Sequence, residues 1–158
     1  MTAIVELKNA TKVITNGFDE EKIILNDVSL EIFEHDFITI LGGNGAGKST
    51  LFNTIAGTLP LTSGSIRIMG EDVTNFSPEK RAKYLSRVFQ DPKMGTAPRM
   101  TVAENLLIAK FRGEKRGLLL RRLSSHREEF QTTIEKVGNG LEKHLDTPIE
   151  FLSGGQRQ

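Results

Sequence analysis

The chain has 158 residues, no cysteine, and a formal net charge of +1, from 21 Lys and Arg against 20 Asp and Glu. This length suits one domain with a buried core. The lack of cysteine excludes disulfides and thiolate metal sites, and the balanced charge does not indicate a polyanionic partner. Neither a signal peptide nor an apolar stretch long enough to cross a bilayer is predicted.

The first part of the chain is predicted to be rich in strands. Short alternating segments begin at Ile4, Lys12 and Ile23, with turn-forming residues between them, and they predict an antiparallel sheet. The continuous apolar run FITIL at 37–41 predicts a strand that is buried on both faces. A glycine-rich loop follows this run directly.

A helix is predicted over 48–59, where Leu51, Ile55 and Leu59 recur at a spacing of four and Gly57 helps to end the helix.

Two further strands, 63–70 and 86–91, are predicted on either side of a short helix that begins at Ser77. The chain is then predicted to be helical: Thr101 and Glu104 form a capping-box pattern, and a second polar helix begins at Ser124. We place a boundary near Asp91. It separates a nucleotide-binding core with an antiparallel β subdomain (1–91) from a helical subdomain (92–152) and a final segment (153–158).

The glycine-rich loop predicts a phosphate site, because Gly42, Gly47, Lys48 and Ser49 fit the pattern G-x-x-x-x-G-K-[ST] between strand and helix. Glycines let backbone N–H groups approach phosphates, and the following helix directs its positive end at the same anion. Lys48 would bind the β- and γ-phosphates, and Ser49 would bind Mg²⁺. A plain glycine turn is the alternative. The predicted nucleotide-binding residues are Gly42, Gly43, Asn44, Gly45, Ala46, Gly47, Lys48, Ser49 and Thr50.

Three segments in register, GGNGAGKST, VFQDP and LSGGQRQ, resemble the ATP-binding cassette (ABC) ATPases over essentially the whole chain. The resemblance implies an α/β fold: a P-loop NTPase core with an antiparallel β subdomain and a helical subdomain. Two longer segments are similar in sequence to the ATPases of bacterial amino-acid-type uptake systems: HDFITILGGNGAGKST and RVFQDPKMGTAPRMTVAEN.

The resemblance also assigns roles. Lys48 and Gln90 would be the catalytic residues, and Ser49 and Gln90 the Mg²⁺ ligands, with Gln90 binding the ion or positioning the attacking water. The signature segment would contact the nucleotide of an opposite subunit, so that two head-to-tail chains enclose two Mg·ATP. The signature residues implied in this contact are Ser153, Gly154, Gly155 and Gln156.

The implied partners are a second ATPase subunit, a transmembrane permease and a separate solute-binding protein, with the ATPase peripheral on the cytoplasmic face of the membrane and no nucleic acid bound. The segment after Gln90 would meet the permease. The basic stretch Lys110–Arg122 is interpreted as a solvated face, and a membrane or nucleic-acid patch is the alternative.

The sequence departs from the family pattern at two places. Ile14 stands where an aromatic residue commonly stacks on adenine, and Phe18 is the alternative. The family places its second magnesium-site strand, catalytic glutamate and switch histidine beyond the signature. We therefore expect a C-terminal truncation, an exposed apolar edge, and little or no hydrolysis by this chain alone. The histidines that precede the signature are expected to be solvated or locally bonded: His35, His126 and His144.

Two rival functions stay open. One is a soluble ABC ATPase of translation or DNA repair, although such proteins usually carry two cassettes or long insertions. The other is a non-catalytic nucleotide-binding fragment, which would bind ATP without turnover.

Overall fold

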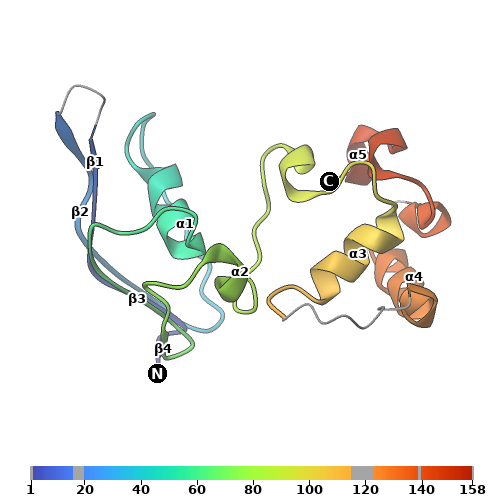
Figure 1. Ribbon diagram of the computed structural model, residues 1–158, viewed down its shortest axis with the longest axis horizontal. Coiled ribbons are helices and arrows are strands. Elements are labelled where there is room, and N and C mark those ends of the chain that lie inside the picture. The colour runs from blue at the N-terminus through green and yellow to red at the C-terminus, as the bar shows by residue number, and fades with distance from the viewer. Residues whose placement is uncertain (1, 16–19, 115–122, 139, 158) are drawn as a thin grey trace. The chain divides into compact units, whose positions relative to one another are not determined.

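The computed structural model describes residues 2–15, 20–114, 123–138 and 140–157. The chain divides into two compact units, Met1–Leu85 and Ser86–Gln158 (Figure 1). This division falls somewhat earlier in the chain than the boundary predicted near Asp91. Each unit has its own hydrophobic core.

The first unit is built on a four-stranded antiparallel sheet in the order β2-β1-β3-β4. The predicted antiparallel sheet is confirmed, but the segments from Ile4 and Lys12 join into a single strand, β1, with irregularities in its pairing. The strands are β1 (Val5–Thr15), β2 (Glu21–Ile32), β3 (Ser63–Ile68) and β4 (Glu71–Asp72).

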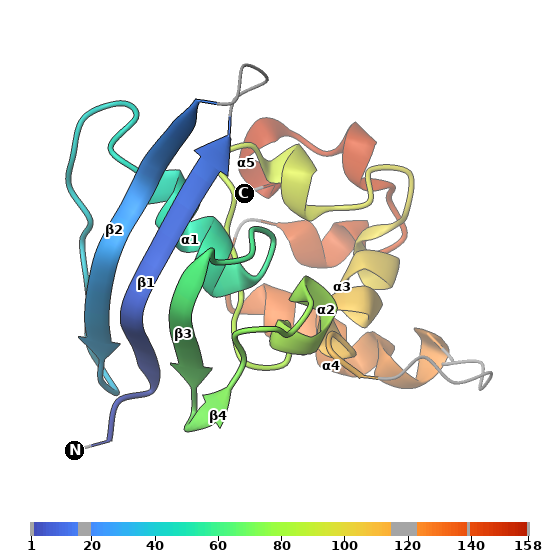
Figure 2. The same cartoon turned by 60° about the vertical axis from the view of Figure 1, so that its left-hand side comes forward.

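Helix α1 (Lys48–Ala56) covers one face of this sheet (Figures 1 and 2). Leu51 of the helix lies in the same buried core as Leu7 of β1 and Ile66 of β3, which are opposite each other in the sheet. Gly57 takes a left-handed φ of 81° and ends the helix before the predicted end at residue 59. The buried core of the unit is Leu7, Ala10, Leu25, Leu51, Ile66, Ile68 and Val73.

The predicted strands 37–41 and 86–91 are wrong. Both segments are irregular, and each exposes apolar residues: 94% for Phe37, 86% for Leu41 and 95% for Val88. Ile40 and Phe89 are half-buried. A strand buried on both faces needs hydrogen-bonding neighbours on its two edges. Within the described residues neither segment has such a neighbour, because the only sheet there consists of β1 to β4.

The second unit is helical around one core. Its longer helices are α3 (Val102–Lys110) and α4 (Arg127–Glu135), and the predicted capping box at Thr101 and Glu104 is confirmed. Among the described residues, no helix combines the length and apolar character that crossing a bilayer requires.

The remaining helical turns are α2 (Pro78–Arg81) in the first unit, and η1 (Pro92–Gly95), η2 (Leu123–His126), η3 (Leu141–His144), η4 (Ile149–Phe151) and α5 (Gly154–Arg157) in the second. The buried core of the second unit is Val102, Ala103, Phe130, Ile134, Leu145, Ile149 and Leu152.

Candidate functional site

The glycine-rich loop turns sharply into α1. Gly47 has a φ of 85°, in the left-handed region, and a Cβ at this position would lie 2.9 Å from the carbonyl oxygen of Ile24. Both the backbone conformation and the lack of space therefore require glycine. The carbonyl of Gly47 accepts the hydrogen bond from the N–H of Leu51 at 2.8 Å and so begins the helix.

The N-terminus of α1 is suited to an anion. Its N-cap makes no side-chain hydrogen bond, and its first turn contains no acidic residue. The N–H groups of that turn have no partner within the helix, and the helix dipole places a partial positive charge there. Ser49 is exposed and Thr50 half-buried on this same turn. A phosphate group fits this arrangement.

Lys48 lies over the start of the loop. Its Nζ donates hydrogen bonds to the carbonyl oxygens of Gly42 and Gly43, both at 2.6 Å. The ammonium group is thus held beside the helix N-terminus, where it adds a full positive charge to the partial one. The other loop residues predicted for the nucleotide are exposed on the surface: Gly42, Gly43, Asn44, Gly45 and Ala46.

The opposite end of α1 is held by Arg81, a residue that the sequence did not single out. Its side chain is only 2% exposed. Nη1 donates to the carbonyl oxygens of Thr54 at 2.6 Å and Ile55 at 2.9 Å. The other nitrogens reach the β4–α2 connection, with Nη2 donating to the carbonyl oxygen of Thr74 at 2.9 Å and Nε to that of Phe76 at 3.2 Å. Burial of the guanidinium lowers the pKa of Arg81.

Gln90 belongs to the second unit, whereas Lys48 and Ser49 belong to the first. It is exposed and lines an open pocket of about 400 Å³, together with Phe89, Thr96 and Arg157. Its amide oxygen and the Ser49 hydroxyl are the hard oxygen donors that Mg²⁺ prefers. In the described ranges, no three His, Asp or Glu side chains come close enough together to hold a metal.

The signature segment folds into the short turn α5. Ser153 and Gln156 cap it reciprocally: the Ser153 Oγ donates to the Gln156 Oε1 at 3.1 Å and accepts from the Gln156 N–H at 3.4 Å. Gly154 and Gly155 are exposed, and a Cβ at either position would meet no atom within 4 Å. The glycines therefore leave the backbone of this turn open to solvent.

Of the two candidate positions for adenine stacking, only Ile14 lies among the described residues, because Phe18 falls outside them. Ile14 is 43% exposed near the end of β1. The sole tyrosine, Tyr84, donates a hydrogen bond to Glu71. Most of the basic stretch, 115–122, also lies outside the described residues.

The histidines differ in their surroundings. His126 lies beside Lys110 and Glu129, and the centroid of its ring is 5.4 Å from the centroid of the Phe111 ring. His35 is largely exposed.

Comparisons with known proteins agree with this geometry. Residues 25–158 match the family model described as "ABC transporter". The chain is 39% identical over 156 residues to a tyrosine transport ATP-binding protein of Clostridioides difficile (strain R20291), covering 98% of the chain and 61% of that relative. It is 37% identical over 155 residues to the spermidine/putrescine import ATP-binding protein PotA of Haemophilus ducreyi, covering 98% of the chain and 37% of that relative.

Solved structures give the same fold. The dimeric post-hydrolysis structure of the ATP-binding cassette MJ0796 bound to ADP and Pi has a TM-score of 0.75 and 27% identity, covering 97% of the chain and 65% of that structure. A nucleotide-free ATP-binding cassette from an ABC transporter has a TM-score of 0.70 and 30% identity, covering 99% of the chain and 61% of that structure. The α/β P-loop cassette fold is thereby confirmed. The chain spans only 61% of the length of its tyrosine-transport relative.

Proposed function

Because the chain belongs to the ABC transporter family, we propose that it binds Mg·ATP and forms part of the ATPase subunit that drives solute uptake through a membrane permease. The observation that carries this proposal is the phosphate loop. Gly47 has the left-handed backbone and the tight contact that only glycine tolerates, the α1 N-terminus is uncapped by side chains, and Lys48 is held beside it. These features together favour a polyphosphate ligand.

Different groups of the loop would bind different parts of Mg·ATP. Backbone N–H groups of 43–50 would cradle the phosphates, and the Lys48 ammonium would move from the loop carbonyls to the β- and γ-phosphate oxygens. Ser49 and Gln90 are the residues proposed to hold Mg²⁺, and Thr50 is placed to bond the α-phosphate. The bound ion would neutralise part of the phosphate charge. Gln90 would also orient the attacking water.

The signature turn would serve the nucleotide of a second subunit. In this proposal Ser153 and its exposed neighbours Gly154 and Gly155 contact the γ-phosphate held by the partner, and Gln156 fixes the Ser153 hydroxyl. The match to a dimeric cassette with ADP and Pi supports a pair of subunits, and the head-to-tail arrangement of that pair is part of the proposal. Closure of the pair around ATP and reopening after hydrolysis would then drive the permease.

The relatives support an import system. They include ATP-binding proteins of tyrosine transport, ribose import and spermidine/putrescine import. We infer that the transported solute is small and polar, that a separate solute-binding protein delivers it, and that the ATPase is peripheral on the cytoplasmic face of the membrane. The segment after Gln90 is proposed as the permease contact.

The test is phosphate release from Mg·ATP by the full-length protein. Lys48→Ala should lower the rate by about 100-fold or more, because it removes a charge that faces the transferred phosphoryl group. Lys143→Ala, which removes an exposed lysine of η3, is the matched control and should leave the rate unchanged.

Equal rates for the parent and Lys48→Ala would overturn the proposed chemistry. Binding of Mg·ATP without release of phosphate would favour the non-catalytic alternative. Recovery of the protein with ribosomes or nucleic acid, rather than with membranes, would favour the soluble ATPases.

A further inference from the structure

Asn105 of α3 makes side-chain hydrogen bonds to both ends of the loop 97–101, in addition to the capping box of Thr101 and Glu104. Its Nδ2 lies within hydrogen-bond distance of the carbonyl oxygens of Ala97 at 3.1 Å, Met100 at 3.2 Å and Thr101 at 2.9 Å. Its Oδ1 accepts from the N–H of Ala97 at 2.8 Å. The half-buried amide therefore bonds both ends of the loop at once. A carboxylate of the same size has no hydrogen to donate to these carbonyls.

The same loop is hydrogen-bonded on its other side to the segment 145–150. The N–H groups of Ile149 and Glu150 donate to Met100 at 3.1 Å and to Pro98 at 3.0 Å. The N–H of Val102 donates to the carbonyl of residue 147 at 3.1 Å. The carbonyl of Met100 is thus shared between Asn105 and Ile149, so a displaced loop would take the 149–150 backbone with it.

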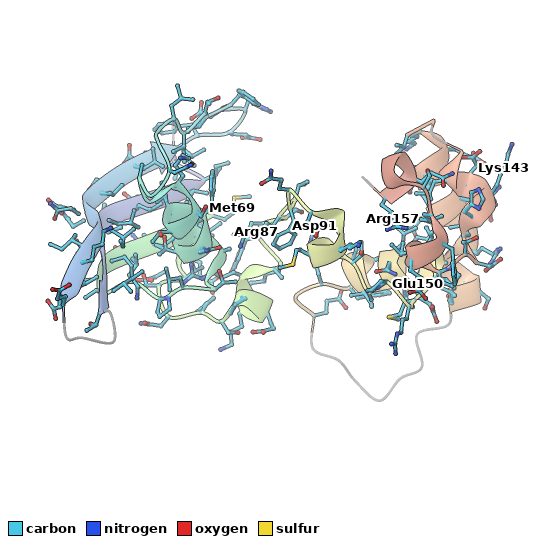
Figure 3. The ribbon with its side chains drawn as sticks, turned by 90° about the horizontal axis from the view of Figure 1, so that it is seen from above. Met69, Arg87, Asp91, Lys143, Glu150 and Arg157 are labelled. Atoms are coloured by element: carbon cyan, nitrogen blue, oxygen red, sulfur yellow. The ribbon has the colours of Figure 1, made fainter. Side chains whose placement is uncertain are left out.

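The segment 149–152 in turn fixes the signature turn. The N–H of Leu152 donates to the carbonyl of Ile149 at 3.1 Å, and both side chains are buried in the core of the second unit. Arg157, at the end of α5, donates from Nη2 to the carbonyl of Glu150 at 2.7 Å and from Nε to that of Leu152 at 2.9 Å (Figure 3). The position of Ser153 therefore depends on backbone that the loop 97–101 holds.

We propose that Asn105 is a positioning residue for the signature turn 153–157. This inference rests on the proposed function, in which the turn contacts the nucleotide of a second subunit. Asn105 touches neither nucleotide nor metal in this account. Asn105 holds the loop 97–101 in place, and this loop holds the backbone of 149–152. That backbone in turn positions the signature turn. The loop follows the Gln90 segment directly in the chain, so a partner that moves this loop would also move the signature.

A purely structural role would have a different consequence. If Asn105 only stabilised the N-terminus of α3, its loss would lower the stability of the second unit without a selective effect on pairing. The readout must therefore separate the association of two subunits, which needs the signature turn, from nucleotide binding by the chain's own phosphate loop.

The experiment compares the full-length parent with Asn105→Ala. The dissociation constant for Mg·ATP at the phosphate loop, measured by calorimetry at a protein concentration too low for pairing, should stay within about twofold. Nucleotide-dependent pairing, measured by sedimentation with a non-hydrolysable ATP analogue and Mg²⁺, should weaken by about tenfold or more, the effect of losing a well-placed contact. Asn105→Ser can bond the carbonyl of Thr101 four residues earlier. Pairing of Asn105→Ser should be weakened less than pairing of Asn105→Ala. Asn105→Ser also serves as the test variant if Asn105→Ala does not fold.

Ile134→Val is the matched control, since it removes a methylene from the core of the same unit without touching the loop. At an equal loss of melting temperature it should pair as the parent does. Unchanged pairing of the Asn105 variants, or an equal loss in Ile134→Val, would overturn the inference while leaving the proposed function intact. A parent that shows no nucleotide-dependent pairing would overturn both.

Discussion

The buried Arg81 offers a quantitative test of how the phosphate loop is supported. Arg81→Ala removes the donors for four carbonyl oxygens, of which Thr54 and Ile55 lie in the last turn of α1. The Thr54 oxygen keeps one further donor, the N–H of Gly57 at 3.2 Å. A buried acceptor left unpaired costs about 1–3 kcal/mol. Water can reach part of the space that the side chain leaves. We therefore count about 1 kcal/mol, the lower end of this range, at each of the four oxygens, which gives about 3–4 kcal/mol.

Native-state hydrogen exchange of the α1 amides measures this loss locally. A reduction of about 3–4 kcal/mol corresponds to exchange that is a few hundred times faster. Amides of α4, in the second unit, are the internal control and should not change. Arg81→Lys keeps the charge but loses the planar fork, so it should recover only part of the protection. The second control is Lys80→Ala, at the exposed residue next to Arg81. It should change the free energy of opening of α1 by no more than about 0.5 kcal/mol. Equal α1 exchange in Arg81→Ala and Lys80→Ala would show that the hydrogen bonds of Arg81 do not stabilise α1.

Three further predictions concern single positions. Gly47→Ala places a Cβ 2.9 Å from the Ile24 oxygen at a left-handed φ, and calorimetry should give a dissociation constant for Mg·ATP raised about tenfold or more; an unchanged constant would contradict the loop geometry. Thr101→Ala removes the cap of α3 and should cost about 1 kcal/mol in urea unfolding, whereas Thr101→Ser should not. The hydrogen bond with Arg127 lowers the pKa of Asp146, so its stabilisation is present above the ordinary Asp pKa of about 4 and is lost as pH falls through the lowered value. Asp146→Asn should flatten the acid limb of stability against pH, and an unaltered limb would exclude this pair as its cause.

The features that could be predicted from the sequence are those that neighbouring residues determine. The turn at Gly47, the helix from Lys48 and the capping box at Thr101 each depend on residues within a few positions of one another. Backbone sterics and local hydrogen bonds are enough to form them. The fold family was likewise predicted from three short segments in register, and the family match confirms it.

The features that could not be predicted depend on distant partners. The apolar run 37–41 has the composition of a buried strand, but a strand forms only beside another strand, and none pairs with it among the described residues. Arg81 lies in a polar segment, where an arginine usually faces solvent, and only the fold brings Thr54 and Thr74 around it. Asn105 gave no signal either, since its partners are backbone groups that any residue type supplies.

The proposed function requires that the phosphate loop bind Mg·ATP through Lys48. The decisive measurement is the thermal unfolding of the chain with and without Mg·ATP, for the parent and for Lys48→Ala. A ligand at about 100 times its dissociation constant stabilises the folded state by about 2.7 kcal/mol. We predict a cooperative transition that Mg·ATP shifts to higher temperature in the parent and not in Lys48→Ala. An equal shift in both proteins, or none in a cooperatively folding parent, would contradict binding of Mg·ATP through Lys48.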